Sequence, residues 1–405
     1  MTVLLEDAAL ARRADAPALA VALRASRDDT LATFALFENA LAPLHVPCRE
    51  ALNPPLWELG HIGWFQEFWT SRNPLRFSGA VADPAAARLP GLRRGADALY
   101  DSSTVAHGAR WSLPLPDAAA TRADLAEQLD HTLAWLRRAD ENDTALYFFR
   151  LALFHEDMHH EAALYAAQSL GLAVADARWQ PPLLAAQCRP LRFEAGAWAL
   201  GHSGGGFVFD NEGASHAVAL PPTCIDSQPV RWADFLPFVE AGGYGEPGWW
   251  CDAGAAWLHE PDERRRAPRY LRRYEGTWQQ WRHGVWQALN PNHPACHLTA
   301  HEALAWCRWA GRRLPSEAEW ERAAVDQPGD FEWGHVWEWT ASPFLPYPGF
   351  VPHPYREYSA PWFGSRQVLR GGSFMTQKRM RHPRYRNFFM AHRNDVPAGF
   401  RSCAL

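Results

Sequence analysis

The chain has 405 residues and a formal net charge of −5, which allows two domains with substantial cores and gives no basic stripe for nucleic acid. No apolar run is long enough to span a membrane, and the first residues, Met-Thr-Val-Leu-Leu-Glu-Asp, lack the basic start of a secretory signal. Seven scattered cysteines without a Cys-x-x-Cys motif indicate reduced thiols. We therefore expect a cytoplasmic protein that binds neither nucleic acid nor a membrane.

The first 180 residues are dominated by stretches rich in Ala and Leu. Their periodicity predicts helices over 17–42, 54–70, 120–139 and 144–170. Four long helices predict a bundle, in whose core facing side chains can build a metal site. Gln180-Pro181-Pro182 has the composition of a linker. We therefore predict two domains, over 1–182 and 183–405.

The second predicted helix carries a histidine among aromatic residues. At helical spacing, His61 shares its face with Trp57 and Phe65. Gly60 and Gly63 flank the histidine and lower the helix propensity of the segment. Glycines at such positions indicate that another helix or a ligand approaches closely.

The fourth predicted helix contains His155 and His159, four residues apart in a run without Gly or Pro. Positions i and i+4 lie above one another on a helix, so both imidazoles can reach one metal ion. A single inward histidine is more often a hydrogen-bonded core residue than a ligand, and for an inward pair the two interpretations are about equally supported. With His61, the pair could supply a site of three imidazoles.

The C-terminal half consists of short segments punctuated by Gly, Pro and Trp, with one helix pair predicted around 299–325. This composition predicts a mixed α+β domain. Its motifs resemble the formylglycine-generating-enzyme (sulfatase-modifying factor) domain, which implies a C-type-lectin-like fold. The stretch from Ser373 to Gly399 has no cysteine, so the resemblance does not extend to that activity. The motifs are Phe193–Gly201, Phe209–Glu212, Leu220–Val230, His301–Glu321, Val336–Thr340, Arg370–Phe374 and Ala398–Arg401.

The two halves together resemble the ergothioneine-synthase-like (EgtB-type) family, in which a DinB-like four-helix bundle precedes such a domain. The family motifs Leu-Gly-His and His-x-x-x-His-x-Glu match Leu59–His61 and His155–Glu161. The resemblance implies an α+β multidomain fold with Fe(2+) bound by His61, His155 and His159. It also implies O2-dependent bond formation at C2 of the imidazole of hercynine, a trimethylated histidine betaine. Three imidazoles leave positions open on octahedral iron, although the same ligands could hold zinc.

The resemblance also assigns substrate residues in the second half. The family's Tyr-x-x-Tyr pair matches Tyr355, implied as the catalytic donor of a proton and an electron, and Tyr358. Without the resemblance, both would be interpreted as packing aromatics. The family's Arg-Asn-aromatic segment, which binds the quaternary ammonium of hercynine, matches residues 386–388. The predicted substrate-binding residues are Met158, Tyr358, Arg386, Asn387, Phe388, Phe389 and Arg393.

Two departures from the family pattern concern the chalcogen donor. Relatives that use γ-glutamylcysteine have an acidic residue where this chain has Phe389, and many have Gln where it has Met158. Loss of both polar groups disfavours a zwitterionic amino-acid donor and favours a neutral sugar. This pattern resembles the selenoneine synthase branch, which joins a selenosugar to hercynine. The alternative is an ergothioneine sulfoxide synthase that uses cysteine or γ-glutamylcysteine.

Three other classes remain as alternatives. His155-Glu156-x-x-His159 matches the zinc-protease pattern, in which the glutamate is a general base. Protease sites usually take a third ligand from downstream, but here the predicted helix soon ends at Gly171. A DinB-type metal-dependent thiol transferase would also use three bundle histidines. The last alternative is a lectin-like binding module without activity.

Overall fold

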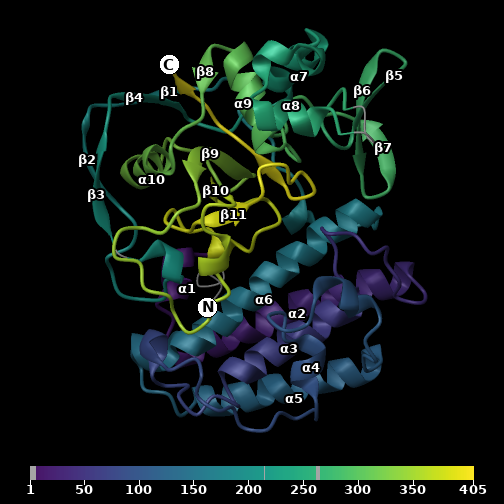
Figure 1. The fold of residues 1–405 in the computed structure, drawn as a ribbon, viewed down its shortest axis with the longest axis vertical. Helices are drawn as coiled ribbons and strands as arrows, with labels where there is room; N and C mark the ends of the chain where they lie inside the picture. Colours follow the sequence, from purple (N-terminus) through teal and green to yellow (C-terminus); the bar gives the residue numbers. More distant parts are fainter. Residues whose placement is uncertain (1–5, 214, 261–264) are drawn as a thin grey trace.

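The computed structural model describes residues 6–213, 215–260 and 265–405. Helices make up the N-terminal half, and the strands follow in the C-terminal half (Figure 1). The expectation of no secretory signal rests on the first residues of the chain. Residues 1–5 of that segment lie outside the described part.

The four long helices predicted from periodicity are confirmed. They correspond to α2, α3, α5 and α6, and the short helices α1 and α4 were not predicted. Among the described helices, none is both long and apolar enough to cross a membrane. The bounds are α1 Ala8–Arg12, α2 Ala16–Ala40, α3 Pro55–Trp69, α4 Ala96–Tyr100, α5 Ala118–Leu136 and α6 Asp143–Leu170.

Local sequence signals explain where α6 begins and ends. The Asn142 side chain accepts a hydrogen bond from the Ala145 N–H, which caps the first turn. Gly171 follows the last turn with a φ of 76°, a left-handed conformation that glycine adopts without strain. The helix packs against α2 and α3, while α3 also packs against α5. The bundle thereby encloses one face of both α3 and α6.

The C-terminal half contains two four-stranded sheets, with orders β1-β4-β13-β8 and β11-β10-β9-β12, and two smaller antiparallel sheets. Within the second four-stranded sheet, β12 runs parallel to β9 and the other pairs are antiparallel. The strands are β1 Pro190–Phe193, β2 Gly196–Leu200, β3 His216–Leu220, β4 Thr223–Asp226, β5 Leu271–Tyr274, β6 Thr277–Arg282, β7 Val285–Ala288, β8 Arg312–Arg313, β9 Trp337–Pro343, β10 Gln367–Arg370, β11 Asn387–Phe389, β12 Ala398–Gly399 and β13 Cys403–Ala404.

The predicted helix pair is confirmed as α9 (Ala300–Trp309) and α10 (Glu317–Asp326), and each begins with a capping box. Two further helices, α7 (Trp232–Glu240) and α8 (Asp252–Leu258), were missed because seven to nine residues give too few turns for a clear period. All seven cysteines are unpaired, which agrees with the expectation of reduced thiols.

Helix α6 connects the two halves through buried polar side chains. Asp157 accepts hydrogen bonds from the Arg379 guanidinium at 2.6 and 2.7 Å. Glu161 accepts from the indole N–H of Trp337 at 2.8 Å and from the Ser373 hydroxyl at 2.7 Å. Both carboxylates are buried, so these bonds must be kept for the halves to stay packed. In Figure 1, α6 lies on the side of the bundle that faces the strands.

Candidate metal centre and substrate cavity

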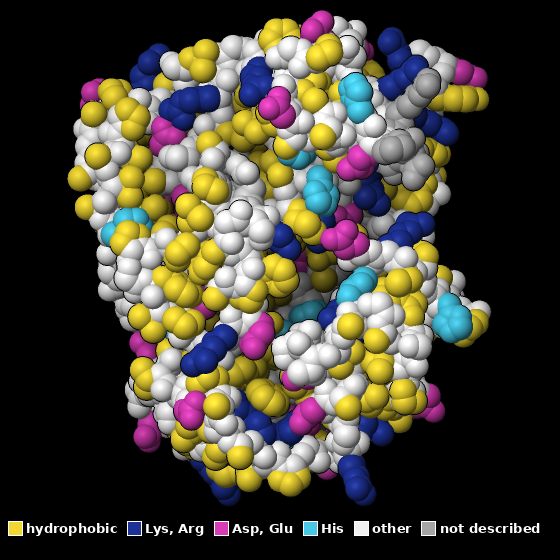
Figure 2. All heavy atoms as spheres, viewed as in Figure 1, with side chains coloured by type: hydrophobic (Ala, Val, Ile, Leu, Met, Phe, Trp, Pro, Cys, Tyr) yellow, Lys and Arg dark blue, Asp and Glu magenta, His cyan; other side chains and the backbone are white. Residues whose placement is uncertain are grey.

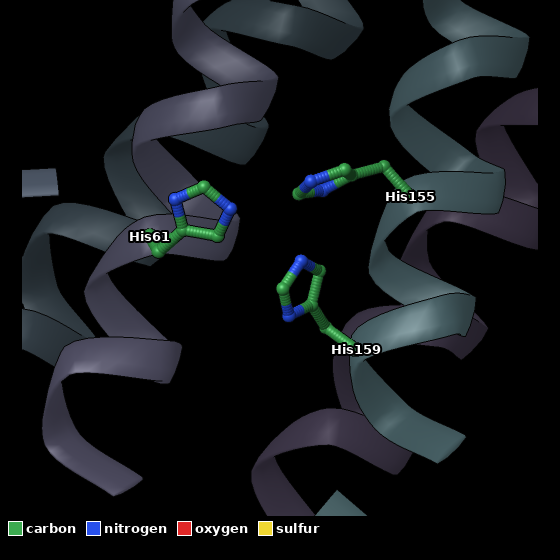
Figure 3. Close-up of side chains that lie close together, drawn as sticks. All are labelled: His61, His155 and His159. Atoms are coloured by element: carbon green, nitrogen blue, oxygen red, sulfur yellow. The ribbon is translucent and has the colours of Figure 1, made fainter. Parts of the chain in front are cut away.

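Three histidine side chains from two helices converge in the bundle. His61 comes from α3, while His155 and His159 come from consecutive turns of α6 (Figure 3). One ring nitrogen from each lies within 4.8 Å of the others. The ring centroids are 4.4 Å apart for the α6 pair, and His61 lies 5.2 Å from His155 and 4.8 Å from His159. The sequence-predicted triad is therefore brought together.

Hydrogen bonds orient two of the three rings. Nδ1 of His61 donates to the Tyr100 carbonyl oxygen at 2.8 Å, because a carbonyl can only accept. Nδ1 of His159 donates to the Glu58 carboxylate at 2.5 Å. Bonds of this kind fix the tautomer and leave Nε2 as the atom with a free lone pair. Both Nε2 atoms are thus available to a metal ion.

The third ring, His155, is oriented by stacking. It lies flat against the Phe65 ring, with centroids 3.4 Å apart and planes 1° from parallel. The residue is 2% exposed, and both of its ring nitrogens lack a hydrogen-bond partner among the described residues. A buried unpaired nitrogen is costly unless a ligand occupies it. The orphaned imidazole therefore fits a metal ion.

Burial keeps two of these imidazoles, His61 and His155, neutral. It is the main cause that lowers the pKa of His61 to about 3 and the pKa of His155 well below its usual range. Neutral imidazole is the form that binds metal ions. Three neutral ligands would leave the charge of a divalent ion uncompensated, which favours anionic or polarisable co-ligands from a substrate.

The two glycines around His61 are explained by close helix packing. A Cβ on Gly60 would lie 2.3 Å from the Tyr100 ring of α4, and one on Gly63 would lie 2.1 Å from the Gln128 side chain of α5. The expected close approach thus comes from neighbouring helices. This packing brings Tyr100 within reach of His61.

A cavity of about 730 Å³ lies between the bundle and the C-terminal half. Figure 2 shows the surface hollowed where the halves meet, with histidine side chains along the hollow. The cavity brings together most of the sequence-predicted residues from both halves. Its lining includes His155, Met158, His159, Tyr355, Tyr358, Asn387, Phe388 and Phe389.

Tyr355 stands beside the histidines. Its ring lies 6.1 Å from that of His155 and packs edge-on against Phe65 at 4.9 Å. Burial raises the pKa of Tyr355 above its usual value, so the phenol keeps its proton at neutral pH. Tyr358 stacks on Phe209 with centroids 4.6 Å apart. The first tyrosine can therefore reach a molecule held at the histidines.

Two predicted substrate residues do not line the cavity. Arg386 is buried and bonds to the Glu317 carboxylate at 2.8 and 3.0 Å, so its guanidinium is occupied inside the domain. Arg393 pairs with Asp395 at 2.6 and 2.7 Å, and its guanidinium lies 5.0 Å from the Phe389 ring centroid. A buried guanidinium needs a carboxylate partner. Both arginines thus support the strand segment behind the cavity without lining it.

Several residues of the site were not identified from the sequence. Glu58 could have been found, because it precedes His61 by three residues and lies on the same helical face. Ser102, Ser103 and Glu357 also line the cavity. They belong to loops without a recognisable motif, and only the fold brings them to the site.

The zinc-protease interpretation is wrong for this chain. Glu156, its proposed general base, is buried and bonds to Arg27 at 2.8 and 3.1 Å. It is rotated about 100° from His155 on the helix and faces α2, away from the triad. A carboxylate held by a buried arginine is not available to activate water at the triad.

Comparison with known proteins identifies the class. Residues 190–335 match the sulfatase-modifying factor enzyme 1-like domain family. Formylglycine-generating enzyme from Streptomyces coelicolor is 27% identical over 248 residues, covering 46% of this chain and 78% of that protein. Two hercynine oxygenases match nearly the whole chain at 31% identity. The one from Mycolicibacterium smegmatis covers 91% of this chain and 95% of its own length, and the one from Mycobacterium tuberculosis 86% and 90%.

The second half thus belongs to the sulfatase-modifying-factor class of domains, and it follows a helical bundle. The chain as a whole belongs to the hercynine oxygenase (EgtB-type) family. It is an oxidoreductase, and its cofactor is Fe(2+). The α+β multidomain fold expected from the resemblance is confirmed.

Proposed function

We propose that this enzyme is a cytoplasmic selenoneine synthase. It would form a C–Se bond at C2 of the hercynine imidazole from the C2–H bond and the Se–H bond of a selenosugar donor, and O2 would accept the two electrons and two protons that these bonds release. The observation that carries the proposal is the unpaired imidazole of His155, which opens into the same cavity as Tyr355 and Asn387. The runner-up is an ergothioneine sulfoxide synthase that forms a C–S bond.

The proposed ligands of Fe(2+) are His61, His155 and His159, all within the proposed domain 1–182. When bound there, the iron supplies O2 activation and positions for the two substrates. Hydrogen bonds that the His61 and His159 rings donate to the Tyr100 carbonyl and the Glu58 carboxylate hold the two rings in the ligating orientation. The remaining functional side chains come from the proposed domain 183–405.

The proposed hercynine site lies at β11. Asn387 and Phe388 line the cavity, and the Phe388 ring is held by stacking on Phe344 at 4.0 Å. An aromatic face suits a trimethylammonium group, which cannot donate hydrogen bonds. Tyr355 is the proposed proton donor, because its neutral phenol stands between this strand and the histidines.

The donor assignment rests on Phe389 and Met158, which both line the cavity. An amino-acid thiol brings an ammonium and carboxylates that need polar partners, and these two side chains offer none. A neutral sugar brings no charged groups that would be buried without such partners. In addition, a selenolate forms at lower pH than a thiolate, which favours it as the partner of an uncompensated metal charge.

The test is a competition between donors. The enzyme is loaded with Fe(2+) and hercynine without oxygen, then exposed to O2 with a selenosugar, cysteine or γ-glutamylcysteine, and products are measured by mass spectrometry. We expect the selenosugar to give the highest kcat/KM. If γ-glutamylcysteine reacts faster than any selenosugar, the enzyme is an ergothioneine synthase instead.

A further inference from the structure

A second, smaller cavity adjoins the substrate cavity at Tyr355, and we name it the side chamber. Its volume is about 280 Å³, close to the lower limit of about 300 Å³ for small-molecule sites. The two cavities share four lining residues: Tyr355, Ser102, Ser103 and Glu357. The two cavities therefore adjoin at these residues, and the histidines line only the larger one.

The floor of the side chamber is an aromatic face of α3. It is formed by Trp64, Phe65, Phe68 and Trp69. Phe65 is the ring on which His155 stacks, so the floor contacts one of the proposed iron ligands directly. Flat aromatic faces pack well against the C–H groups of a ring-shaped ligand.

The rim of the side chamber is polar and comes from two loops. Ser102 and Ser103 are exposed in the segment after α4, and Arg356 and Glu357 are exposed in the segment around Tyr355. Asp101 adds a second carboxylate, which accepts from the Ser103 hydroxyl at 2.6 Å. Hydroxyls and carboxylates at the edge of an apolar floor can bond the hydroxyls of a sugar.

The charges around the side chamber are balanced. The lining carries two carboxylates and the Arg356 guanidinium, and the Arg88 guanidinium lies 4.4 Å from the Phe68 ring centroid and 4.9 Å from that of Trp69, beside the floor. A site without net charge does not favour a charged donor over a neutral one. The hydroxyls of a neutral sugar can accept from Arg356 and donate to the acids.

We propose that the side chamber binds the sugar moiety of the chalcogen donor, while hercynine occupies the larger cavity. This assignment rests on the proposed function for its choice of a sugar. The chalcogen would then extend from the side chamber past Tyr355 into the larger cavity, which His155 and His159 line. The aromatic floor with acids at its rim also has the chemistry of an ammonium site, and the test below distinguishes the two occupants.

The test uses a matched pair of variants in one exposed loop. Ala85 lines the side chamber, whereas Ala87, two residues on and equally exposed, lies outside its lining. Ala85→Trp places a large side chain at the chamber, and Ala87→Trp adds the same side chain elsewhere. We expect Ala85→Trp to raise the KM for the selenosugar about tenfold or more and to leave the KM for hercynine within about twofold. Ala87→Trp should change neither.

Binding of 1-thio-β-D-glucose to the anaerobic Fe(2+)–hercynine enzyme, measured by calorimetry, gives a readout without turnover. Loss of this binding in Ala85→Trp supports the assignment of the side chamber to the sugar. If wild-type enzyme makes no C–Se product, only the proposed function is overturned, and the binding result still supports the side chamber. An unchanged KM for the selenosugar in Ala85→Trp overturns the chamber and leaves the proposed function intact. A raised KM for hercynine alone would assign the chamber to the ammonium group and also overturn the proposal.

Discussion

The carboxylate of Glu58 accepts a hydrogen bond from Nδ1 of His159 at 2.5 Å, and the two residues lie on different helices, α3 and α6. Burial alone would raise the pKa of Glu58, but the interactions with His159, together with those with His61 and Asn53, outweigh it and lower the pKa to about 2. The carboxylate therefore stays ionised at neutral pH. It holds the His159 ring with Nε2 toward the other two histidines.

Glu58→Ala should weaken iron binding by about 10- to 100-fold, the usual effect of removing a partner that orients a metal ligand. The measurement is an Fe(2+) titration under anaerobic conditions. Glu127→Ala, at an exposed position on α5, is the control and should bind iron like the wild-type enzyme. Equal affinity in both variants would show that Glu58 does not position the ligand.

The triad predicts a clear difference between neighbouring histidines. His61→Ala, His155→Ala and His159→Ala should each abolish tight iron binding, because each removes one of three ligands. His160 instead contacts the Thr33 hydroxyl at 3.0 Å and the Trp179 ring, away from the triad. His160→Ala should therefore keep its iron while losing about 1–3 kcal/mol of stability. Full iron occupancy in His61→Ala, measured by elemental analysis, would contradict the triad.

Tyr355→Phe should separate binding from chemistry. The change keeps the ring that packs on Phe65 and removes only the hydroxyl. Hercynine affinity should stay nearly constant, while product formation should fall by about 100-fold or more, the scale of a lost proton donor. Single-turnover measurements after O2 addition test this. Unchanged turnover would reduce Tyr355 to a packing residue.

Asp210 predicts a pH dependence of stability. Burial, partly offset by a hydrogen bond from Ser359, raises the pKa of its carboxyl to about 6, against about 4 in an unfolded chain. The folded protein thus binds this proton more tightly than the unfolded chain does. The stabilisation of the folded state by this proton is therefore complete below about pH 4 and is lost as the pH rises through 6. Compared with Asp210→Asn, wild-type enzyme should lose about 2 kcal/mol more between about pH 4.5 and 7.5. Urea unfolding at both pH values measures the difference, and parallel pH profiles would contradict it.

Phe389→Asp should change the donor preference. The new carboxylate would line the substrate cavity with Arg393 nearby, and it would offer a partner for the ammonium of an amino-acid thiol. We expect measurable use of γ-glutamylcysteine and reduced kcat/KM for the selenosugar. Phe389→Leu, which keeps an apolar side chain, is the control. No gain of γ-glutamylcysteine turnover would show that residue 389 does not select the donor.

The bundle and its histidines could be predicted because their signals are local. Helix α6 has 28 residues, a capping asparagine and a terminating glycine, so periodicity and end signals agree. His155 and His159 share a helical face by spacing alone. By contrast, α1 and α4 have five residues each and give no period to detect.

The parts of the site that were missed depend on long-range contacts. Arg386 matched a family motif, but its partner Glu317 lies 69 positions away and occupies its guanidinium. Ser102 and Ser103 reach the cavity only because α4 and the following loop pack over α3. Sequence patterns report which residue types recur at fixed spacing, and they do not report which loops meet in space.

Helix α6 carries two of the three proposed iron ligands on one face and, through Asp157 and Glu161, the buried bonds to the C-terminal half on others. The loops around Ala85, Ser102 and Glu357 take no part in those bonds. Substitutions in these loops can therefore accumulate during evolution without displacing the metal ligands or separating the halves. On the proposed function, donor use can therefore change in these loops and at Phe389 while the metal ligands and Tyr355 stay in place, and directed evolution of donor use should begin there.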